Sequence, residues 1–142
     1  MMKMVNNAKG QRGASAIEFA IILPVLVTLL FGIIEMSILF YDKAVITNAS
    51  REGARAGIVL APTPLDDSGI AGVVDTYCAS NLITFGSTTS ATTTVSRGGS
   101  GTHGDPLTVT VNYPYDFLVL PNFVTALAGP VNLQAVTVMR ME

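Results

Sequence analysis

The segment from Ala14 to Tyr41 constrains this chain most, because it is almost wholly apolar and contains only two charged residues, Glu18 and Glu35. As a helix rising 1.5 Å per residue it would be about 42 Å long, more than the roughly 30 Å of a bilayer's hydrocarbon core. A secretory signal peptide has a shorter apolar run, of about 7–15 residues, followed by a small-residue cleavage site. The segment is therefore predicted to be a membrane-spanning helix that stays on the mature protein.

The charges on either side of this segment predict its orientation. Three cations precede it, whereas the first two charges after it, on Asp42 and Lys43, nearly cancel. The preceding cations are Lys3, Lys9 and Arg12. Because basic residues favour the cytoplasmic side, the N-terminal leader is expected in the cytoplasm and everything after Tyr41 outside.

The length and charge of the chain limit what else it contains. A chain of 142 residues leaves room for one small domain beside the membrane segment, rather than two globular domains. Without residues 1–13, five Lys and Arg residues would face ten Asp and Glu residues. An acidic chain without a basic patch argues against nucleic acid as a partner. Cys78 is the single cysteine, so no internal disulfide is possible, and a buried thiol is favoured over a redox or crosslinking role.

Glu18 is a costly residue at its position, since a charge inside a membrane segment costs about 2.5–3.5 kcal/mol on insertion scales. It stands five residues after Gly13, where cleavage before Ala14 would create an α-amine with a pKa of about 8. An ammonium and a carboxylate that neutralise one another cost far less than either charge alone. The amine and Glu18 could pair within one helix or between neighbouring subunits. The alternatives are a protonated Glu18 or one that extends to the cytoplasmic interface.

Gly13 suits a cleavage site because a protease must hold an extended backbone at the scissile bond, and glycine places no side chain there. A plain linker glycine is the alternative. The order of features supports cleavage at this position: a basic leader comes first, then Gly13, and the apolar run follows the glycine.

Gly13, the four residues after it, and Glu18-Phe19 resemble the prepilin-peptidase motif of type IV pilin-like proteins. The form Arg-Gly-x-x-x-x-Glu-Phe, followed by Ile22-Leu23-Pro24, looks most like TadE, a minor pilin or pseudopilin of tight-adherence (Tad/Flp) pili. Three further segments are similar to that family: residues 48–55, 109–115 and 137–142. The mature length fits the TadE and TadF types better than the larger TadG type.

The resemblance implies removal of the leader by a prepilin peptidase between Gly13 and Ala14, and a role for Glu18 and Phe19 in assembly. It implies that the protein lies in the bacterial inner membrane, with its C-terminal domain extracytoplasmic, and can enter the extracellular pilus. The expected partners are other pilin or pseudopilin subunits, the Tad inner-membrane platform and the lipid bilayer. The expected function is pilus biogenesis, adherence and biofilm formation.

Enzymatic signatures are not found in the sequence, so neither catalytic activity nor a cofactor is expected. His103 is the single histidine, and no second His or Cys stands at a metal-ligand spacing from it. The alternative to a pilin is an unprocessed, single-span module that anchors an extracytoplasmic binding domain to the membrane.

Two further residues of the apolar segment carry their own predictions. Pro24 removes the hydrogen bond to the carbonyl of Ala20, so we expect a kink or a segment that can melt. Glu35 lies about 25 Å along the helix from Glu18, near the outer membrane interface. It is predicted to be interfacial and hydrated, with a second intersubunit pair as the less favoured alternative.

Beyond the span the same helix is expected to continue to about residue 60. A stripe of mostly small residues recurs at helical spacing and is predicted to pack against the globular domain rather than against a partner. The stripe consists of Val45, Ala49, Gly53, Ala56 and Leu60. Pro62 and Pro64 would end the helix, and Asp66, Asp67 or Ser68 would cap a second helix of about 15 residues.

Alternation of apolar and polar residues predicts three strands, over Thr93–Arg97, Leu107–Tyr113 and Val131–Met139. Residues 98–104 would form a flexible hairpin loop between the first two strands. Residues 114–130 are expected to be an irregular loop with a short helix near 123–128, and its apolar stretch 117–124 is assigned to the core rather than to an exposed surface. The fold class is α+β: a leader (1–13), a long helix (14–60, spanning at about 14–41) and an extracytoplasmic domain (61–142).

Overall fold

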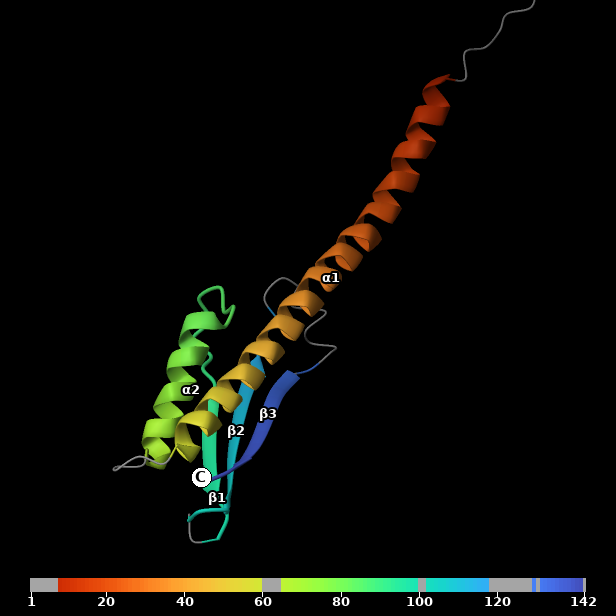
Figure 1. Ribbon diagram of the computed structural model, residues 1–142. Helices are drawn as coiled ribbons and strands as arrows, with labels where there is room; N and C mark the ends of the chain where they lie inside the picture. The colour runs from red at the N-terminus through yellow and green to blue at the C-terminus, as the bar shows by residue number, and fades with distance from the viewer. Residues whose placement is uncertain (1–7, 60–64, 100–101, 118–128, 130, 142) are drawn as a thin grey trace, which may run out of the picture.

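The computed structural model describes residues 8–59, 65–99, 102–117, 129 and 131–141. It has the order α1 (Ala8–Ile58), α2 (Asp67–Asn81), β1 (Thr92–Arg97), β2 (Pro106–Tyr115) and β3 (Val131–Arg140). Figure 1 shows α1 as a long rod whose first half extends beyond the rest of the molecule and whose second half lies on the sheet. The α+β fold predicted from the sequence is confirmed: a long apolar N-terminal helix packs on a three-stranded antiparallel sheet.

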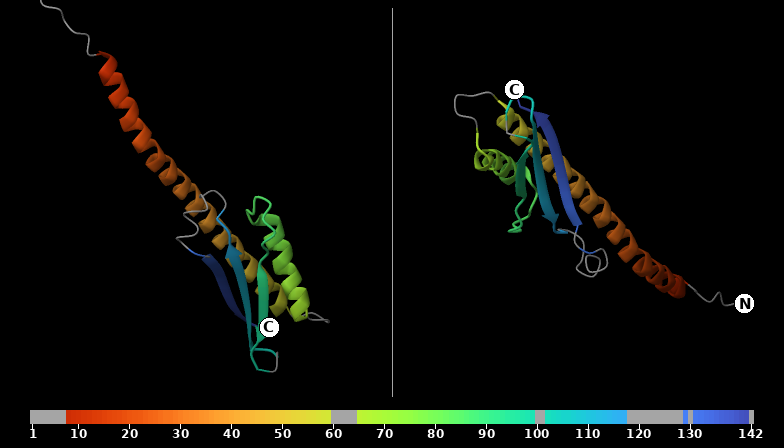
Figure 2. Two further views of the ribbon diagram at one scale, coloured as in Figure 1. Left: turned by 180° about the vertical axis from the view of Figure 1, so that it is seen from behind. Right: turned by 90° about the horizontal axis from the view of Figure 1, so that it is seen from below.

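The sheet has the strand order β1-β2-β3, so β1 and β3 form its two edges. In its register Val95 is opposite Val109, and Val109 is opposite Thr137. Both helices cover one face of the sheet: α1 contacts β2 and β3, and α2 contacts α1 and β1. The views in Figure 2 show the helices side by side on that face, with α2 toward the β1 edge.

The predicted strands are confirmed, and β2 is longer than expected because it continues through Pro114 to Tyr115. A proline normally interrupts a central strand since it lacks the N–H that the neighbouring strand needs. Here β1 begins at Thr92, which pairs with Asn112, so β1 contributes no residue opposite Pro114. On its other side Pro114 pairs with Asn132 of β3. The proline therefore leaves no ladder hydrogen bond unmade on the β1 side.

The core lies between the helices and the inner face of the sheet. Alternate residues of β2, from Leu107 to Tyr115, are buried there, and α2 contributes Ile70, Val74 and Cys78. The thiol of Cys78 is buried, as the sequence predicted. Phe117 packs against this core, which agrees with the prediction for the start of the 117–124 stretch. The rest of that stretch and the short helix predicted near 123–128 lie outside the described residues.

Two glycines allow α1 and α2 to approach closely. A Cβ atom on Gly57 would lie 2.5 Å from Cδ1 of Ile70 and 2.6 Å from Cδ2 of Leu107, and one on Gly53 would collide with Cγ2 of Val74. The small-residue stripe predicted on α1 thus packs inside the molecule at Val45, Ala49 and Gly53. Ala56 is only half-buried because Gly57 takes the inner position, and Leu60 lies outside the described residues.

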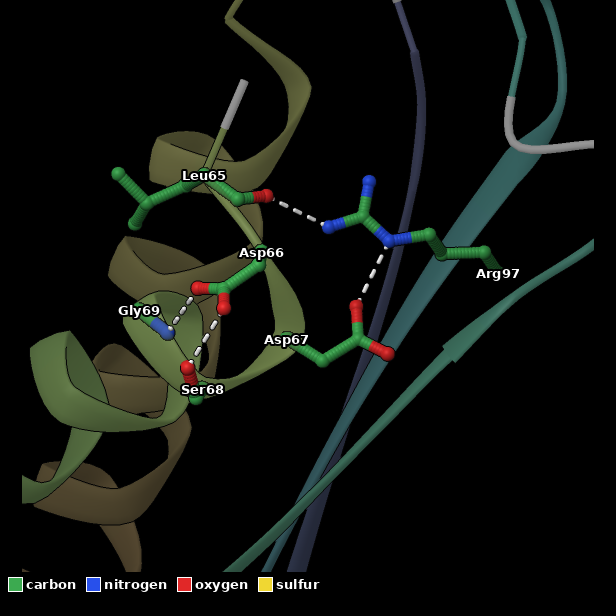
Figure 3. A network of polar contacts seen from close by, with 6 residues as sticks. All are labelled: Leu65, Asp66, Asp67, Ser68, Gly69 and Arg97. Atoms are coloured by element: carbon green, nitrogen blue, oxygen red, sulfur yellow. Dashed lines mark hydrogen bonds and ion pairs between the residues drawn. The ribbon is translucent and has the colours of Figure 1, made fainter. Parts of the chain in front are cut away.

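The polar contacts at the start of α2 fix this helix to the β1 edge, as Figure 3 shows. Asp66 is the N-cap: Oδ1 accepts a hydrogen bond of 2.8 Å from the amide of Gly69, and Oδ2 accepts one of 2.7 Å from Ser68. Of the three caps considered from the sequence, the structure selects Asp66. Arg97 of β1 pairs with Asp67 at 2.7 Å and donates a second hydrogen bond to the carbonyl oxygen of Leu65.

Candidate assembly site on the N-terminal helix

The first half of α1 presents apolar side chains outward along its whole circumference. Every residue from Gly13 to Phe31 is exposed, and side chains such as Phe19 and Val25 are 62% and 67% exposed. The helix is long and apolar enough to cross a membrane, with a mean hydropathy of 2.6 in its most apolar window and none of that window buried in the molecule. A soluble protein would cover such a surface, so this half of α1 is a candidate membrane span.

Gly13 and Ala14 both lie inside α1, which begins at Ala8. The bond predicted for cleavage is therefore helical here rather than extended, and a protease that needs an extended chain must unwind the first turns. A Cβ atom on Gly13 would meet nothing within 4 Å. Packing within the described chain thus gives no reason for a glycine at this position.

Glu18 and Phe19 lie together on the exposed half of α1, one turn beyond Ala14. Glu18 makes no hydrogen bond or ion pair with another residue that the structure describes. Four residues of helix separate it from Ala14, which places the Ala14 nitrogen about 6 Å away along the axis. The carboxylate therefore faces outward, within reach of an amine on the same helix or on a neighbouring chain.

Pro24 lies in the middle of the exposed half, and α1 continues through it as a single helix. Thr28 Oγ1 donates a hydrogen bond of 2.8 Å to the carbonyl oxygen of Pro24, one turn back along the helix. The hydrogen bond that a proline removes is the one to the carbonyl four residues earlier, here that of Ala20, so the Thr28 contact does not replace it. The structure describes no break in the helix at Pro24, and it brings no other predicted site residue into contact with it.

Glu35 corrects a sequence prediction, because it is buried rather than interfacial and hydrated. Its side chain is 2% exposed, and Oε1 accepts a hydrogen bond of 2.5 Å from the hydroxyl of Tyr115 at the end of β2. Burial, followed by the carboxylate of Glu35, raises the pKa of Tyr115, so its hydroxyl stays protonated and able to donate. The contact is within one chain, whereas the less favoured alternative placed the partner on another subunit.

Two residues just after the predicted span also bind the globular domain, and the sequence reasoning missed both. Asp42 is fully buried, and its Oδ1 accepts a hydrogen bond of 3.0 Å from the amide of Ile83. Its Oδ2 has no hydrogen-bond partner among the described residues, and burial raises the pKa of this carboxyl. Lys43 donates from Nζ to the carbonyl oxygen of Gln134 on the edge strand β3.

Glu35 and Asp42 continue the buried stripe of α1 toward the membrane. Glu35 and Asp42 are seven residues apart, and Asp42 precedes the buried Ala49 by seven more. Extending the stripe backward from Ala49 at helical spacing would have identified both carboxylates as facing the domain. The site therefore has two parts. One is the exposed, apolar first half of α1 with Glu18, and the other is a junction near Glu35, where the globular domain begins to contact the helix.

Comparison with known proteins finds a match in the same helix. Residues 13–55 match the family model for TadE-like proteins. The match begins at Gly13, covers the exposed half of α1 and ends within the half that packs on the sheet. No curated protein and no solved structure matches the chain.

Proposed function

We propose that this chain, which is TadE-like over residues 13–55, is a minor pilin or pseudopilin of a Tad-type pilus and has no catalytic role. The observation that carries the proposal is the coincidence of that match with an apolar helix that the rest of the molecule leaves uncovered. A helix with apolar side chains all round needs lipid or other helices around it. The helix of a pilin is surrounded by lipid before assembly and by other helices in the fibre.

The membrane span is proposed to be shorter than the whole apolar segment. The 22 residues from 13 to 34 rise about 33 Å, close to the roughly 30 Å of a hydrocarbon core. From Glu35 onward the globular domain contacts the helix, and lipid cannot surround it there. The cations of the leader support an N-terminus in the cytoplasm and a domain outside the inner membrane.

Processing is proposed to occur between Gly13 and Ala14, by a prepilin peptidase. The new amine on Ala14 would pair with Glu18, which has no partner among the described residues. Phe19 beside it would pack in the apolar contact between helices. Assembly with other pilin subunits on the inner-membrane platform would then place the chain in or beneath the fibre, in support of adherence and biofilm formation.

The test is an intact-mass measurement of the protein purified from cells that contain the prepilin peptidase. Loss of the mass of residues 1–13 supports the proposal. A chain that keeps its leader in those cells overturns it. Cells that lack the peptidase are the matched control and should yield the unprocessed mass.

The second candidate, an unprocessed membrane-anchored binding module, is favoured by one observation. A cleft of about 400 Å³ lies between α2 and the segment that leads into β1. Its lining consists of Asp75, Cys78, Ala79, Leu82, Thr84, Thr89, Ser90 and Ala91. The same intact-mass measurement separates the two candidates, because only the pilin requires removal of the leader.

A further inference from the structure

The charged residues of the globular domain are divided between its two sides. Along the α1 and β3 side lie four cations, which we call the basic flank: Lys43, Arg51, Arg55 and Arg140. Along the α2 and β1 side lie four carboxylates, which we call the acidic flank: Asp66, Asp67, Asp75 and Asp116. Among the described residues, Glu52 and Arg97 carry the opposite sign on the basic and acidic flanks respectively. Asp42 of α1 is fully buried, and Asp105 in the loop between β1 and β2 is assigned to neither flank.

The sheet order places these flanks on opposite sides of the domain. β1 and β3 are the two edges of the sheet, and α2 contacts β1 and not β3. Figure 1 shows α2 beyond the β1 edge and α1 across β2 and β3. Arg51 and Arg55 are exposed on α1, one helical turn apart, and neither makes an ion pair within the described part of the chain.

Strand register shows that opposite charges also stand at matching heights along the domain. Near the membrane, Lys43 binds the carbonyl of Gln134, which shares its row of the sheet with Asn112 and Thr92. Asp75 accepts a hydrogen bond of 3.3 Å from Thr93, one residue along from that row. Lys43 and Asp75 are therefore at nearly the same height on opposite edges.

The far end of the domain repeats this arrangement. Asp67 pairs with Arg97, whose row contains Leu107 and Met139, and Arg140 follows in the next row. Figure 3 shows the exposed carboxylates of Asp66 and Asp67 at this end of α2. Arg55 lies two residues before Gly57 on α1. Gly57 packs close to Leu107, which is in the same row of the sheet as Arg97. Both ends of the domain thus carry a cation on one flank and a carboxylate on the other.

We propose that copies of this chain associate side by side in the membrane, with the basic flank of one copy against the acidic flank of the next. The inference rests on the membrane anchoring proposed above. Helices anchored in one bilayer hold neighbouring domains upright and at the same height, which is the arrangement that brings Lys43 opposite Asp75 and Arg140 opposite Asp66 and Asp67. The two flanks differ, so the contact is head-to-tail and can repeat from copy to copy.

Electrostatic complementarity of this kind selects a partner and its orientation more than it supplies affinity. A reversed neighbour would place cations against cations, and a shift along the axis would separate the pairs. Confinement of both anchors to one membrane raises the effective concentration, which allows a set of weak exposed pairs to act.

The experiment measures energy transfer between full-length copies labelled at Thr102→Cys, in a Cys78→Ser background, in vesicles of zwitterionic lipid. Wild-type transfer should fall when ionic strength rises from about 0.01 to about 1 M, because the Debye length shrinks from about 30 to about 3 Å. Reversal of one flank at the paired positions, as Lys43→Glu with Arg140→Glu or as Asp66→Lys with Asp75→Lys, should lower the association constant about tenfold.

A variant that carries both reversals decides the matter, since it restores complementarity with the signs exchanged. Recovery of transfer in this variant supports the proposal and shows that the substituted domain still folds. Unchanged transfer after either single-flank reversal overturns it, as does a failure of the combined variant to recover. Thr94→Glu with Thr110→Glu, on the outer face of the sheet, is the matched control and should leave transfer unchanged.

The readout uses neither cleavage nor a pilus, so it can fail separately from the proposed function. A chain that keeps its leader in peptidase-containing cells would overturn the pilin proposal and leave the flank contact standing. A processed chain whose energy transfer does not change with salt would overturn the flank contact and leave the pilin proposal standing.

Discussion

The hydroxyl of Tyr115 donates a hydrogen bond of 2.5 Å to the carboxylate of Glu35, and thereby joins the membrane-proximal end of β2 to α1. Tyr115 also packs edge-to-face against Tyr113 and Phe117, with ring centroids 6.5 and 5.8 Å away. This contact defines where the free helix ends and the domain begins.

Tyr115→Phe should lower the free energy of unfolding by about 1–3 kcal/mol, because it removes a hydrogen bond to a buried carboxylate. Urea unfolding of the full chain in detergent measures the change. Tyr113→Phe is the matched control, since that hydroxyl makes no hydrogen bond with any described residue. Equal effects of the two substitutions would contradict the importance of the Glu35 contact.

Gly57→Ala should destabilise the domain by about 1–3 kcal/mol, because its Cβ atom would lie 2.5 Å from Ile70 and 2.6 Å from Leu107. Gly72→Ala on α2 is the matched control, since a Cβ atom there meets nothing within 4 Å. That substitution should stabilise the helix by up to about 1 kcal/mol. Thermal unfolding of both variants checks that the two substitutions change the stability in opposite directions. A Gly57→Ala protein as stable as wild type would show that α1 and α2 can separate at little cost.

Asp42→Asn should change the pH dependence of stability. Burial raises the pKa of Asp42 in the folded state, so its stabilising contribution is greatest below the ordinary aspartate pKa and is lost as pH rises through the raised value. Asparagine has no such loss, so the variant should gain stability relative to wild type between acid and neutral pH. The measurement is the difference in free energy of unfolding at several pH values, and a constant difference would refute the prediction.

Asp66→Asn should show the opposite sign and serves as the comparison. The hydroxyl of Ser68 and the amide of Gly69 lower the pKa of Asp66. The stability that this carboxylate contributes is therefore present above its ordinary pKa and is lost as pH falls through the lowered value. The advantage of wild type over Asp66→Asn should shrink toward acid pH.

Cys78 should react slowly in the native protein. Burial, followed by the charge of Asp75, raises the pKa of its thiol to about 11, so about one molecule in a thousand carries the thiolate at pH 8. Alkylation at pH 8 should be at least about a hundredfold slower than in denaturant and should accelerate as pH rises. Thr76→Cys in a Cys78→Ser background gives an exposed thiol on the same helix, and similar rates at the two positions would count against burial of Cys78.

Glu18→Ala should leave cleavage after Gly13 intact and reduce incorporation into pili, because the new amine on Ala14 loses its carboxylate partner. Intact mass measures cleavage, and shearing of fibres from cells followed by immunoblotting measures incorporation. Glu18→Asp is the control that keeps the charge. Normal incorporation of Glu18→Ala would exclude the pairing role.

The secondary structure followed from the sequence because each element has a local signal. Alternation in 107–113 and 131–139 predicted β2 and β3, and the acidic cap before residue 70 predicted α2. The extension of β2 through Pro114 carried no such signal, since it depends on where the neighbouring strand begins. The confinement of α1 to one side of the sheet likewise depends on contacts far apart in the chain.

The junction was predicted wrongly for a similar reason. Glu35 follows a run of apolar residues, and its height along the helix suggests water at the interface. The residue that buries it, Tyr115, stands 80 positions later and lies in a strand that was expected to have ended. Asp42 and Lys43 were considered only as charges for membrane orientation, although both side chains bind backbone groups of the domain.

The continuity of α1 fixes a rotational relationship between its two ends. Seventeen residues separate Glu18 from Glu35, and at 3.6 residues per turn they place the two side chains about 100° apart around the axis. The sheet and α2 hold Glu35 on one side, so the direction in which Glu18 points is set by the domain above the membrane. A neighbour that pairs with Glu18 must therefore approach from one direction around the helix axis. Any rotation of the domain about that axis rotates Glu18 by the same angle.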